Sequence, residues 1–298
     1  MRHSKKGNIF LLTAALVWGF ALVAQKAGMF YLGPFAFTAI RCTMGGVLML
    51  PLIARMNRKR QSKPEYEKPA GFSRRNTILG SLICGTVLAG LILFQQFGLP
   101  YTTVGKAGFI TALYILITPI MGIFLGKKIS GNLWIGVAVG IVGMYFLCLY
   151  NGLGSLTFGD GMMLCAAVVC AVHLHVIDHF VETVEPVKLS AYQFIVAGLV
   201  CVIPAVIFET TTMNAVIECA VPILYAALFS CGIGYTFQVL GQKETDPSLA
   251  SLILSLETVF SLGAGWLVFG EVLTFNEYIG CMLMFAAIII SQLHPRKV

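Results

Sequence analysis

The amino-acid sequence predicts an all-α integral membrane protein with ten transmembrane helices, arranged as two inverted five-helix repeats. Three observations predict this fold: the composition, ten apolar segments in succession, and an internal repeat. Of the 298 residues, 58% are hydrophobic and only 11% are charged, whereas a soluble domain carries about 25% charged residues. Too few charged groups remain to cover a surface in water, so lipid must contact most of this one.

Ten segments approach the length of about 20 mostly apolar residues that a helix needs to cross a bilayer. In order, they are 8–28, 34–54, 77–97, 105–125, 133–150, 161–179, 189–208, 221–241, 249–269 and 278–293. Turn-forming residues separate them, for example at Gly33-Pro34, Asn151-Gly152 and Asp246-Pro247. None of the segments alternates polar and apolar residues as a lipid-facing barrel strand does. Helices are the remaining structure that satisfies its own backbone in lipid.

The first segment follows Arg2, Lys5 and Lys6 and superficially resembles a secretory signal peptide. It is longer than the apolar region of such a peptide, which has about 7–15 residues, and it lacks a small-residue cleavage site. Nine further apolar segments follow it. We therefore interpret it as the first transmembrane helix.

The positions of lysine and arginine predict the orientation of the helices. If the N-terminus is cytoplasmic, 17 of the 20 basic residues lie on the cytoplasmic side, none lies in an outer loop, and three lie within spans. Cytoplasmic loops of membrane proteins carry this excess of positive charge. The sequence thus predicts a plasma (inner) membrane protein with both termini in the cytoplasm. The basic loop 55–75 also accounts for the net charge of +7 without nucleic-acid binding, and it is suited to contact anionic lipid.

The second half of the chain repeats the first, and we place the repeats at 8–150 and 157–293. Before the basic loop the copies are 152 residues apart, and after it they are 144 apart. Identical residues at these spacings include Pro34 and Pro186, Ala39 and Ala191, Gly46 and Gly198, Gly90 and Gly234, Gly126 and Gly270, and Gly136 and Gly280. Each copy holds five helices, an odd number, so the second copy must enter the bilayer the other way up. This is an inverted-topology repeat.

Two charged positions change sign between the copies. Lys127 corresponds to Glu271, and Lys26 corresponds to Asp178. The positive-inside rule explains the first exchange, because the turn at Lys127 is cytoplasmic and the turn at Glu271 is external. Two similar halves of opposite orientation can exchange conformations and open a central site first to one side and then to the other. An enzyme or an anchor does not need this symmetry, so the repeat favours a transporter.

Two motifs resemble a known family. Residues 105–111 read Gly-Lys-Ala-Gly-Phe-Ile-Thr before Pro119 and Gly126, and residues 255–260 read Ser-Leu-Glu-Thr-Val-Phe before Gly270-Glu271 and Gly280. Over about residues 8–293, the chain resembles EamA-type members of the drug/metabolite transporter superfamily. The resemblance implies a ten-helix carrier with a central cavity, often one that exports amino acids or other metabolites. Thr258 stands where such proteins usually carry proline, and Lys127 stands where many carry glutamate.

Ionisable residues within a membrane are candidates for function, because each costs about 2.5–3.5 kcal/mol at a helix centre on insertion scales. Arg41 lies seven residues into the second segment, about 10 Å below the outer boundary at about 1.5 Å per residue. Glu257 lies eight residues into the ninth segment, near mid-depth. We predict that both line a substrate pathway. The alternatives are a purely structural role and a gate in which the two residues neutralise each other.

Three more charged residues lie nearer the ends of their segments: Lys26, Lys106 and Asp178. Lys106 is a further candidate for the pathway, although all three can instead extend their charged groups to the interface. The charges are polarised, because the cations occupy the outer half while Glu257 and Asp178 occupy the middle and inner half. A cavity with a cation toward one side and an anion toward the other favours a zwitterionic solute.

The remaining pathway candidates are Trp18, Gln95, Tyr235 and Gln238. A glutamine within a span needs hydrogen-bond partners, which a water-lined cavity supplies; interior packing is the alternative. His173 and His175 are too close in sequence to share one helix face, so at most one of them faces a cavity. We favour a packed, hydrogen-bonded histidine, with proton coupling as the alternative.

The predicted function is secondary transport of small metabolites, with amino acids or related compounds as exported cargo and alternating access as the mechanism. The expected partners are a small-molecule substrate and the lipid bilayer. We expect no catalytic residue, metal or cofactor: no cysteine or histidine cluster has metal-ligand spacing, and no ATP-binding loop occurs. One alternative is a flippase-like carrier of lipid-linked or drug-like amphipathic molecules. The other is an intramembrane enzyme, which would need a second carboxylate or a nucleophile at the depth of Glu257.

Overall fold

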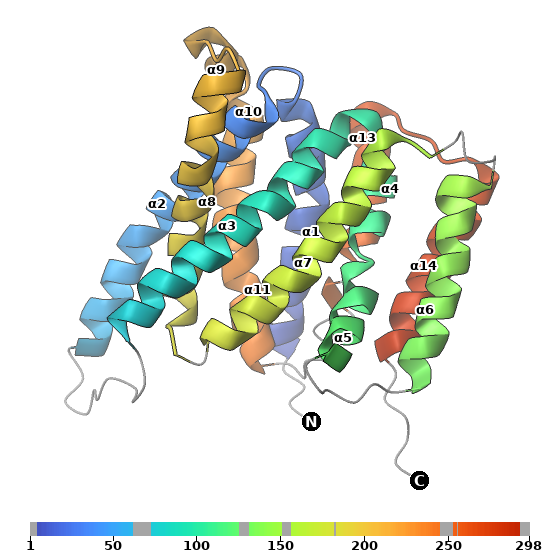
Figure 1. The fold of residues 1–298 in the computed structure, drawn as a ribbon, viewed down its shortest axis with the longest axis horizontal. Helices are drawn as coiled ribbons and strands as arrows, with labels where there is room; N and C mark the ends of the chain where they lie inside the picture. The colour runs from blue at the N-terminus through green and yellow to red at the C-terminus, as the bar shows by residue number, and fades with distance from the viewer. Residues whose placement is uncertain are drawn as a thin grey trace.

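The chain forms a bundle of helices in the computed structural model, which describes residues 5–61, 73–124, 131–150, 156–181, 183–244, 253–254 and 256–292. The long helices run across the bundle from one end to the other (Figure 1). α1 begins and α14 ends at the same end of the bundle, which we call the near end. The opposite end, where α1 ends and α4 begins, is the far end. No strand occurs among the described residues.

The helices follow the predicted segments in order. Their bounds are α1 Lys5–Gly28, α2 Pro34–Gln61, α3 Arg74–Gly98, η1 Leu99–Tyr101, α4 Val104–Thr111, α5 Tyr114–Phe124, α6 Gly131–Met144, η2 Tyr145–Leu149, α7 Phe158–Val181, α8 Pro186–Phe208, α9 Met213–Glu218, α10 Ala220–Leu224, η4 Tyr225–Gly234, α11 Tyr235–Glu244, α13 Glu257–Phe269 and α14 Phe275–Gln292. η1 is a 3₁₀ turn, and η2 and η4 are π-helical segments continuous with their neighbours.

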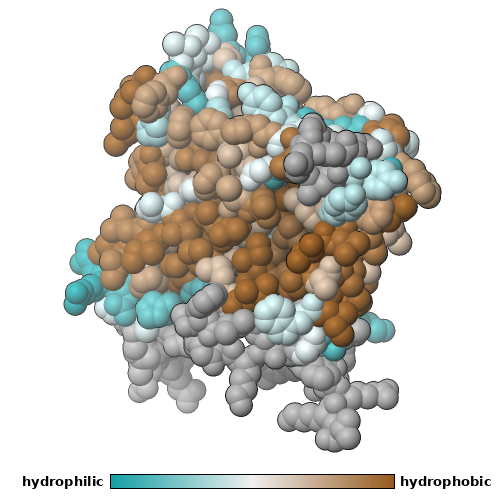
Figure 2. All heavy atoms as spheres, turned by 45° about the vertical axis from the view of Figure 1, so that its right-hand side comes forward, coloured by the Kyte–Doolittle hydropathy of each residue, from teal (hydrophilic) through white to brown (hydrophobic). Residues whose placement is uncertain are grey.

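Among the described residues, seven helical stretches are long and apolar enough to cross a membrane, and three further apolar helices are shorter. The shorter ones are Trp134–Leu147, Glu257–Phe269 and Phe275–Ile290. The prediction of an all-α, multi-pass membrane protein is therefore confirmed. Large apolar side chains face outward around the bundle, for example Val206 and Phe208 near the end of α8, which are 78% and 75% exposed. Figure 2 shows such residues across the middle of one face, with hydrophilic residues toward its ends.

Two helices depart from the predicted continuous spans. In the fourth segment, α4 ends at Thr111 and α5 begins at Tyr114, so the helix is interrupted at Ala112 and Leu113. In the ninth, residues 253–254 are helical, Leu256 lies in a turn and α13 begins at Glu257. Residues 249–252, where the predicted helix begins, lie outside the described residues. Glu257 therefore lies in the first turn of a helix rather than in its middle. Hydropathy does not reveal these interruptions, because the residues on both sides are apolar.

Helices from the two halves of the chain pack against each other. α2 packs along α8, and α6 packs along α14 at one side of the bundle (Figure 1). Other packed pairs are α3 with α7 and α8, α1 with α11 and α13, α2 with η4, α7 with α4 and α5, and α4 with α13. The largest buried apolar cluster includes Leu88 and Ile92 of α3 and Phe194 of α8.

Two glycines allow the close approach of α2 and α8. A Cβ atom on Gly46 would lie 2.7 Å from the carbonyl oxygen of Ala191, and one on Gly198 would lie 2.7 Å from the backbone nitrogen of Thr43. Any larger residue would push the helices apart, as expected where small residues mediate contact between membrane helices. These glycines correspond at the 152-residue spacing of the repeat.

Candidate functional site

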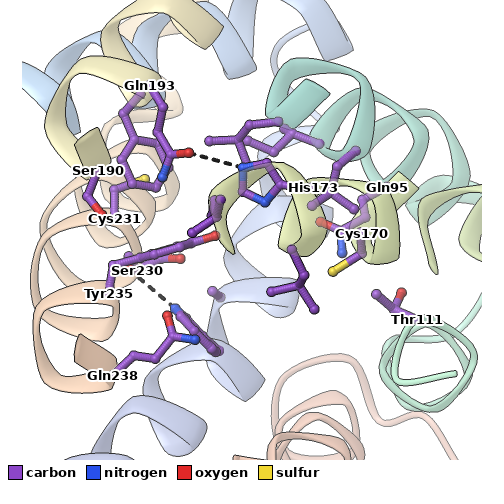
Figure 3. Close-up of a pocket in the computed structure, with 18 of the residues that line it drawn as sticks. Gln95, Thr111, Cys170, His173, Ser190, Gln193, Ser230, Cys231, Tyr235 and Gln238 are labelled. Atoms are coloured by element: carbon purple, nitrogen blue, oxygen red, sulfur yellow. Dashed lines mark hydrogen bonds between the residues drawn. The ribbon is translucent and has the colours of Figure 1, made fainter. Parts of the chain in front are cut away.

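A cavity of about 470 Å³ lies within the bundle. Its lining comes from the helices α1, α2, α3, α4, α5, α7, α8, α11 and α13 and from η4. The lining is mainly apolar, with a small number of polar side chains that converge on the same space (Figure 3). Small-molecule sites commonly combine apolar walls with a few placed polar groups. This cavity is therefore the candidate functional site.

An aromatic cluster forms one wall of the cavity. The ring of Tyr235 meets Trp18 and Phe194 edge-on, at centroid distances of 5.0 and 4.9 Å. The indole nitrogen of Trp18 donates a hydrogen bond of 3.4 Å to the carbonyl oxygen of Ser230 (Figure 3). This bond uses the polar atom of Trp18, so the indole presents an apolar surface. Gln238 lines the cavity one turn after Tyr235 on α11.

Arg41 supplies a buried cation to the cavity from α2. Its side chain donates a 3.0 Å hydrogen bond from Nη2 to Oε1 of Gln25 on α1, and its guanidinium carbon lies 5.5 Å from the ring centroid of Phe37. The Nε atom of Arg41 has no hydrogen-bond partner among the described residues. A buried guanidinium normally has a carboxylate partner, because an unpaired charge is expensive to desolvate. Arg41 thus retains donor capacity for an anionic group.

Glu257 supplies an acid to the same cavity from the first turn of α13. This position places the side chain close to the partial positive charge that the N-terminus of a helix carries. Within the described part of the chain, Glu257 forms no hydrogen bond or ion pair, and none joins it to Arg41. The alternative in which these two residues neutralise each other is not the arrangement seen here.

A second polar pair lies in the other half of the chain. His173 of α7 and Gln193 of α8 both line the cavity, and Nε2 of the histidine is 3.0 Å from Oε1 of the glutamine (Figure 3). Because Oε1 accepts, Nε2 carries the proton of this bond. His175 instead meets the carbonyl oxygen of Thr118 at 2.9 Å and does not line the cavity. Of these two histidines, one therefore faces the cavity, which agrees with the expectation that at most one of them can do so.

Six of the seven pathway candidates line this one cavity: Trp18, Arg41, Gln95, Tyr235, Gln238 and Glu257. Lys106 does not, because its ammonium group turns to the far end and pairs with Glu277 at 2.7 Å. Lys26 likewise pairs with Glu271 at 2.6 Å. The expected excess of cations in the outer half is thus reduced, since two of the three have acidic partners. The side chain of Asp178 lies outside the described residues.

Several cavity residues were not among the candidates, notably Gln25, Tyr114 and Gln193. A signal for Gln25 exists in the sequence. It lies seven residues after Trp18, which places both side chains on one face of α1 at two-turn spacing. Gln193 is the counterpart of Arg41 at the repeat spacing. Tyr114 had no such signal, because its position depends on the interruption between α4 and α5.

Comparison with known proteins identifies the family. The profile of the EamA-like transporter family matches residues 5–149 and again residues 157–293. An uncharacterized transporter of Archaeoglobus fulgidus is 29% identical over 96% of this chain and 85% of the relative. The uncharacterized transporter YoaV of Bacillus subtilis is 23% identical over 94% of each chain.

A chloroplastic WAT1-related protein of Arabidopsis thaliana is 22% identical over 93% of this chain and 67% of its own length. A solved crystal structure shares the fold, with a TM-score of 0.64 and 18% identity over 97% of this chain and 96% of that one. The family and the names of these relatives indicate a transporter rather than an enzyme. The chain belongs to the EamA-like transporter family, and it is a multi-pass membrane transporter.

Proposed function

We propose that the protein is a secondary transporter that exports amino acids or closely related zwitterions by alternating access. The observation that carries this proposal is the pair of charged side chains in one cavity. Arg41 and Glu257 both line it, and neither neutralises the other. A solute with a carboxylate and an ammonium group can supply the partner that each residue lacks. Such charge-assisted hydrogen bonds are stronger in a partly desolvated cavity than in water.

The aromatic wall adds a preference for a bulky apolar side chain. Trp18, Tyr235 and Phe194 contact one another beside the charged groups. Burying apolar surface contributes about 25 cal/mol per Å², so a large side chain gains affinity from these rings. The cavity volume of about 470 Å³ suits a solute the size of an amino acid.

Two features support two inverted five-helix repeats as the basis of alternating access. The interruption at Ala112 and Leu113 and the start of α13 after Leu256 occur at corresponding places, 144 residues apart. Equivalent helices of the two repeats also have equivalent packing partners. α3 packs against α7, as α11 packs against α1. Likewise, α1 packs against α13, as α7 packs against α4 and α5. Interrupted helices at a central site are a recurring feature of such transporters.

The orientation forms part of the same proposal. We place the near end, where α1 begins and α14 ends, in the cytoplasm of a plasma-membrane protein (Figure 1). The sequence pattern, which assigns 17 of the 20 basic residues to the side of the N-terminus, supports this choice.

Counterflow in proteoliposomes tests the cargo. Vesicles loaded with unlabelled phenylalanine should accumulate labelled phenylalanine, whereas the decarboxylated amine and the deaminated acid should exchange poorly. Protein-free vesicles and vesicles with an unrelated membrane protein control for leak. Equal handling of the three compounds, or exchange of none of them, would sink the zwitterion proposal. Exchange of lipid-linked solutes alone would favour the flippase alternative.

A further inference from the structure

A polar cluster closes the far end of the bundle around Lys26. The Nζ atom of Lys26 lies 2.6 Å from Oε1 of Glu271 and donates a 2.8 Å hydrogen bond to the carbonyl oxygen of Thr102. The other carboxylate oxygen of Glu271 accepts a 2.7 Å hydrogen bond from the backbone nitrogen of Val104. We call these four residues the far-end cluster. It joins α1, the start of α4, and the connection between α13 and α14.

Helix electrostatics stabilises both charges of the far-end cluster. Lys26 lies in the last turn of α1, where the carbonyl end of the helix favours a cation. Glu271 binds the first backbone N–H group of α4, where the amino end favours an anion. Both side chains are mostly covered, with 16% and 12% exposed. The helix ends therefore favour the cation at Lys26 and the anion at Glu271. Because both side chains are partly exposed, water can solvate each charge when the two separate.

Neighbouring contacts hold the same end together. Lys106 of α4 pairs with Glu277 of α14, and the hydroxyl of Thr102 donates a 2.6 Å hydrogen bond to Asp160 in the first turn of α7. The ion pairs Lys26–Glu271 and Lys106–Glu277 each join segments far apart in the chain, and both lie at this end. The pair Lys188–Glu185 near the opposite end is local, within one turn.

The cavity extends to the first turns of α8 at the near end. Leu189 and Ser190, in the first turns of α8 at the near end, line the cavity. Their counterparts in the first repeat, Phe37 and Thr38, lie in the first turns of α2 at the far end and have no exposed surface. Equivalent positions of the two repeats therefore line the cavity at the near end and are packed away from it at the far end.

We propose that Lys26 and Glu271 form the outer gate of this transporter, and that their separation is a required step of each transport cycle. This inference rests on the alternating-access function proposed above. In the state seen here the ion pair is formed, which is the closed state of this gate. Opening the far end moves α1 away from Thr102 and Glu271, since those two groups remain attached to α4. Lys26 and Glu271 thereby control access to the cavity without contacting the solute in it.

A labelling experiment tests the gate without any substrate. The reporter is Thr111→Cys, a nearly isosteric change in the cavity lining, in a full-length chain whose nine native cysteines are replaced. A membrane-impermeant maleimide is added from the far-end side of oriented vesicles. Lys26→Gln and Glu271→Gln should each raise the labelling rate by about tenfold, because an alternative state populated at roughly 0.1–10% leaves room for that increase. Lys188→Gln, which breaks the local pair at the opposite end, is the matched control and should leave the rate unchanged.

Unchanged labelling in both gate variants, with the variants shown to be folded by gel filtration, would overturn the gate. If the variants do not fold, the pair Lys26→Cys and Glu271→Cys provides a second test. A short bifunctional thiol reagent should then block far-end labelling of the reporter, and failure to block it would also overturn the proposal. Failure of the cargo proposal would appear only in the counterflow assay. Failure of the gate would appear as unchanged labelling in a protein that still exchanges its solute.

Discussion

Arg41 and Gln193 occupy equivalent positions in the two halves of the chain, and each is hydrogen-bonded to the preceding long helix of its own half. Arg41 of α2 donates to Gln25 of α1, and Gln193 of α8 pairs with His173 of α7. One pair carries a permanent positive charge, whereas the other is a histidine–amide pair. The two halves thus place hydrogen-bonded pairs at equivalent positions, but only the first half contributes a permanent charge there. The charge distribution of the cavity is therefore asymmetric.

Arg41 should determine recognition of a carboxylate. Arg41→Gln removes the charge but keeps an amide that can bond to Gln25. Counterflow of phenylalanine should fall by about tenfold or more, because a hydrogen bond to a charged group contributes about 1.5–3 kcal/mol. Exchange of the decarboxylated amine should change little. An equal loss for both compounds would instead indicate a structural role. Gln193→Leu, at the equivalent uncharged position, is the control and should not alter the preference between the two compounds.

Glu257 should determine recognition of an ammonium group. Glu257→Gln is nearly isosteric, so it should preserve the start of α13 while exchange of phenylalanine falls more than exchange of the deaminated acid. Glu257→Leu and Arg41→Leu should both insert into the membrane normally, since removing a charge from a span favours insertion. Membrane fractionation and counterflow measure these outcomes. Normal transport by both leucine variants would contradict a pathway role for these residues.

The contact of α2 with α8 should be sensitive to side-chain volume. Gly46→Ala places a Cβ atom 2.6 Å from Cγ1 of Ile195, and such overpacking typically costs about 1–3 kcal/mol. The thermal unfolding temperature in detergent should therefore fall. Gly161→Ala in α7 is the matched control, because its Cβ would meet nothing within 4 Å. That variant should be neutral or stabilising, since alanine favours a helix by about 0.5–1 kcal/mol over glycine. Similar behaviour of the two variants would argue against the close approach of α2 and α8.

Both ends of the chain should lie in the cytoplasm. A reporter enzyme that is active only outside the cytoplasm should be inactive when fused after Val298 and active when inserted into the connection between α8 and α9. The physical reason is the clustering of basic residues on one side, which resists translocation. Strong activity of the C-terminal fusion would mean that the number of spans is odd, and the inverted repeat would then fail as well.

Much of this protein could be predicted from local patterns in the sequence. Length and hydropathy identify the apolar segments, and the basic loop predicts their direction, because insertion into lipid depends on each segment and its flanking charges. The repeat spacing predicts that α2 corresponds to α8, and α3 to the stretch formed by α10, η4 and α11. Depth within a span, together with polar character, was enough to select Arg41 and Glu257, both of which line the cavity.

Only the tertiary structure decided which polar groups meet. Lys106, like Arg41, is a basic residue within an apolar segment, yet its side chain turns away from the cavity and pairs with Glu277. Lys26 pairs with Glu271, which is 245 residues away in the sequence. The interruption before Tyr114 and the turn before Glu257 were also hidden, because apolar residues flank both. Hydropathy reports the transfer of each segment from water to lipid, which is a local quantity. The partners of a charge and the path of an interrupted helix depend instead on how distant helices pack, and that packing was set here by close contacts such as those of Gly46 and Gly198.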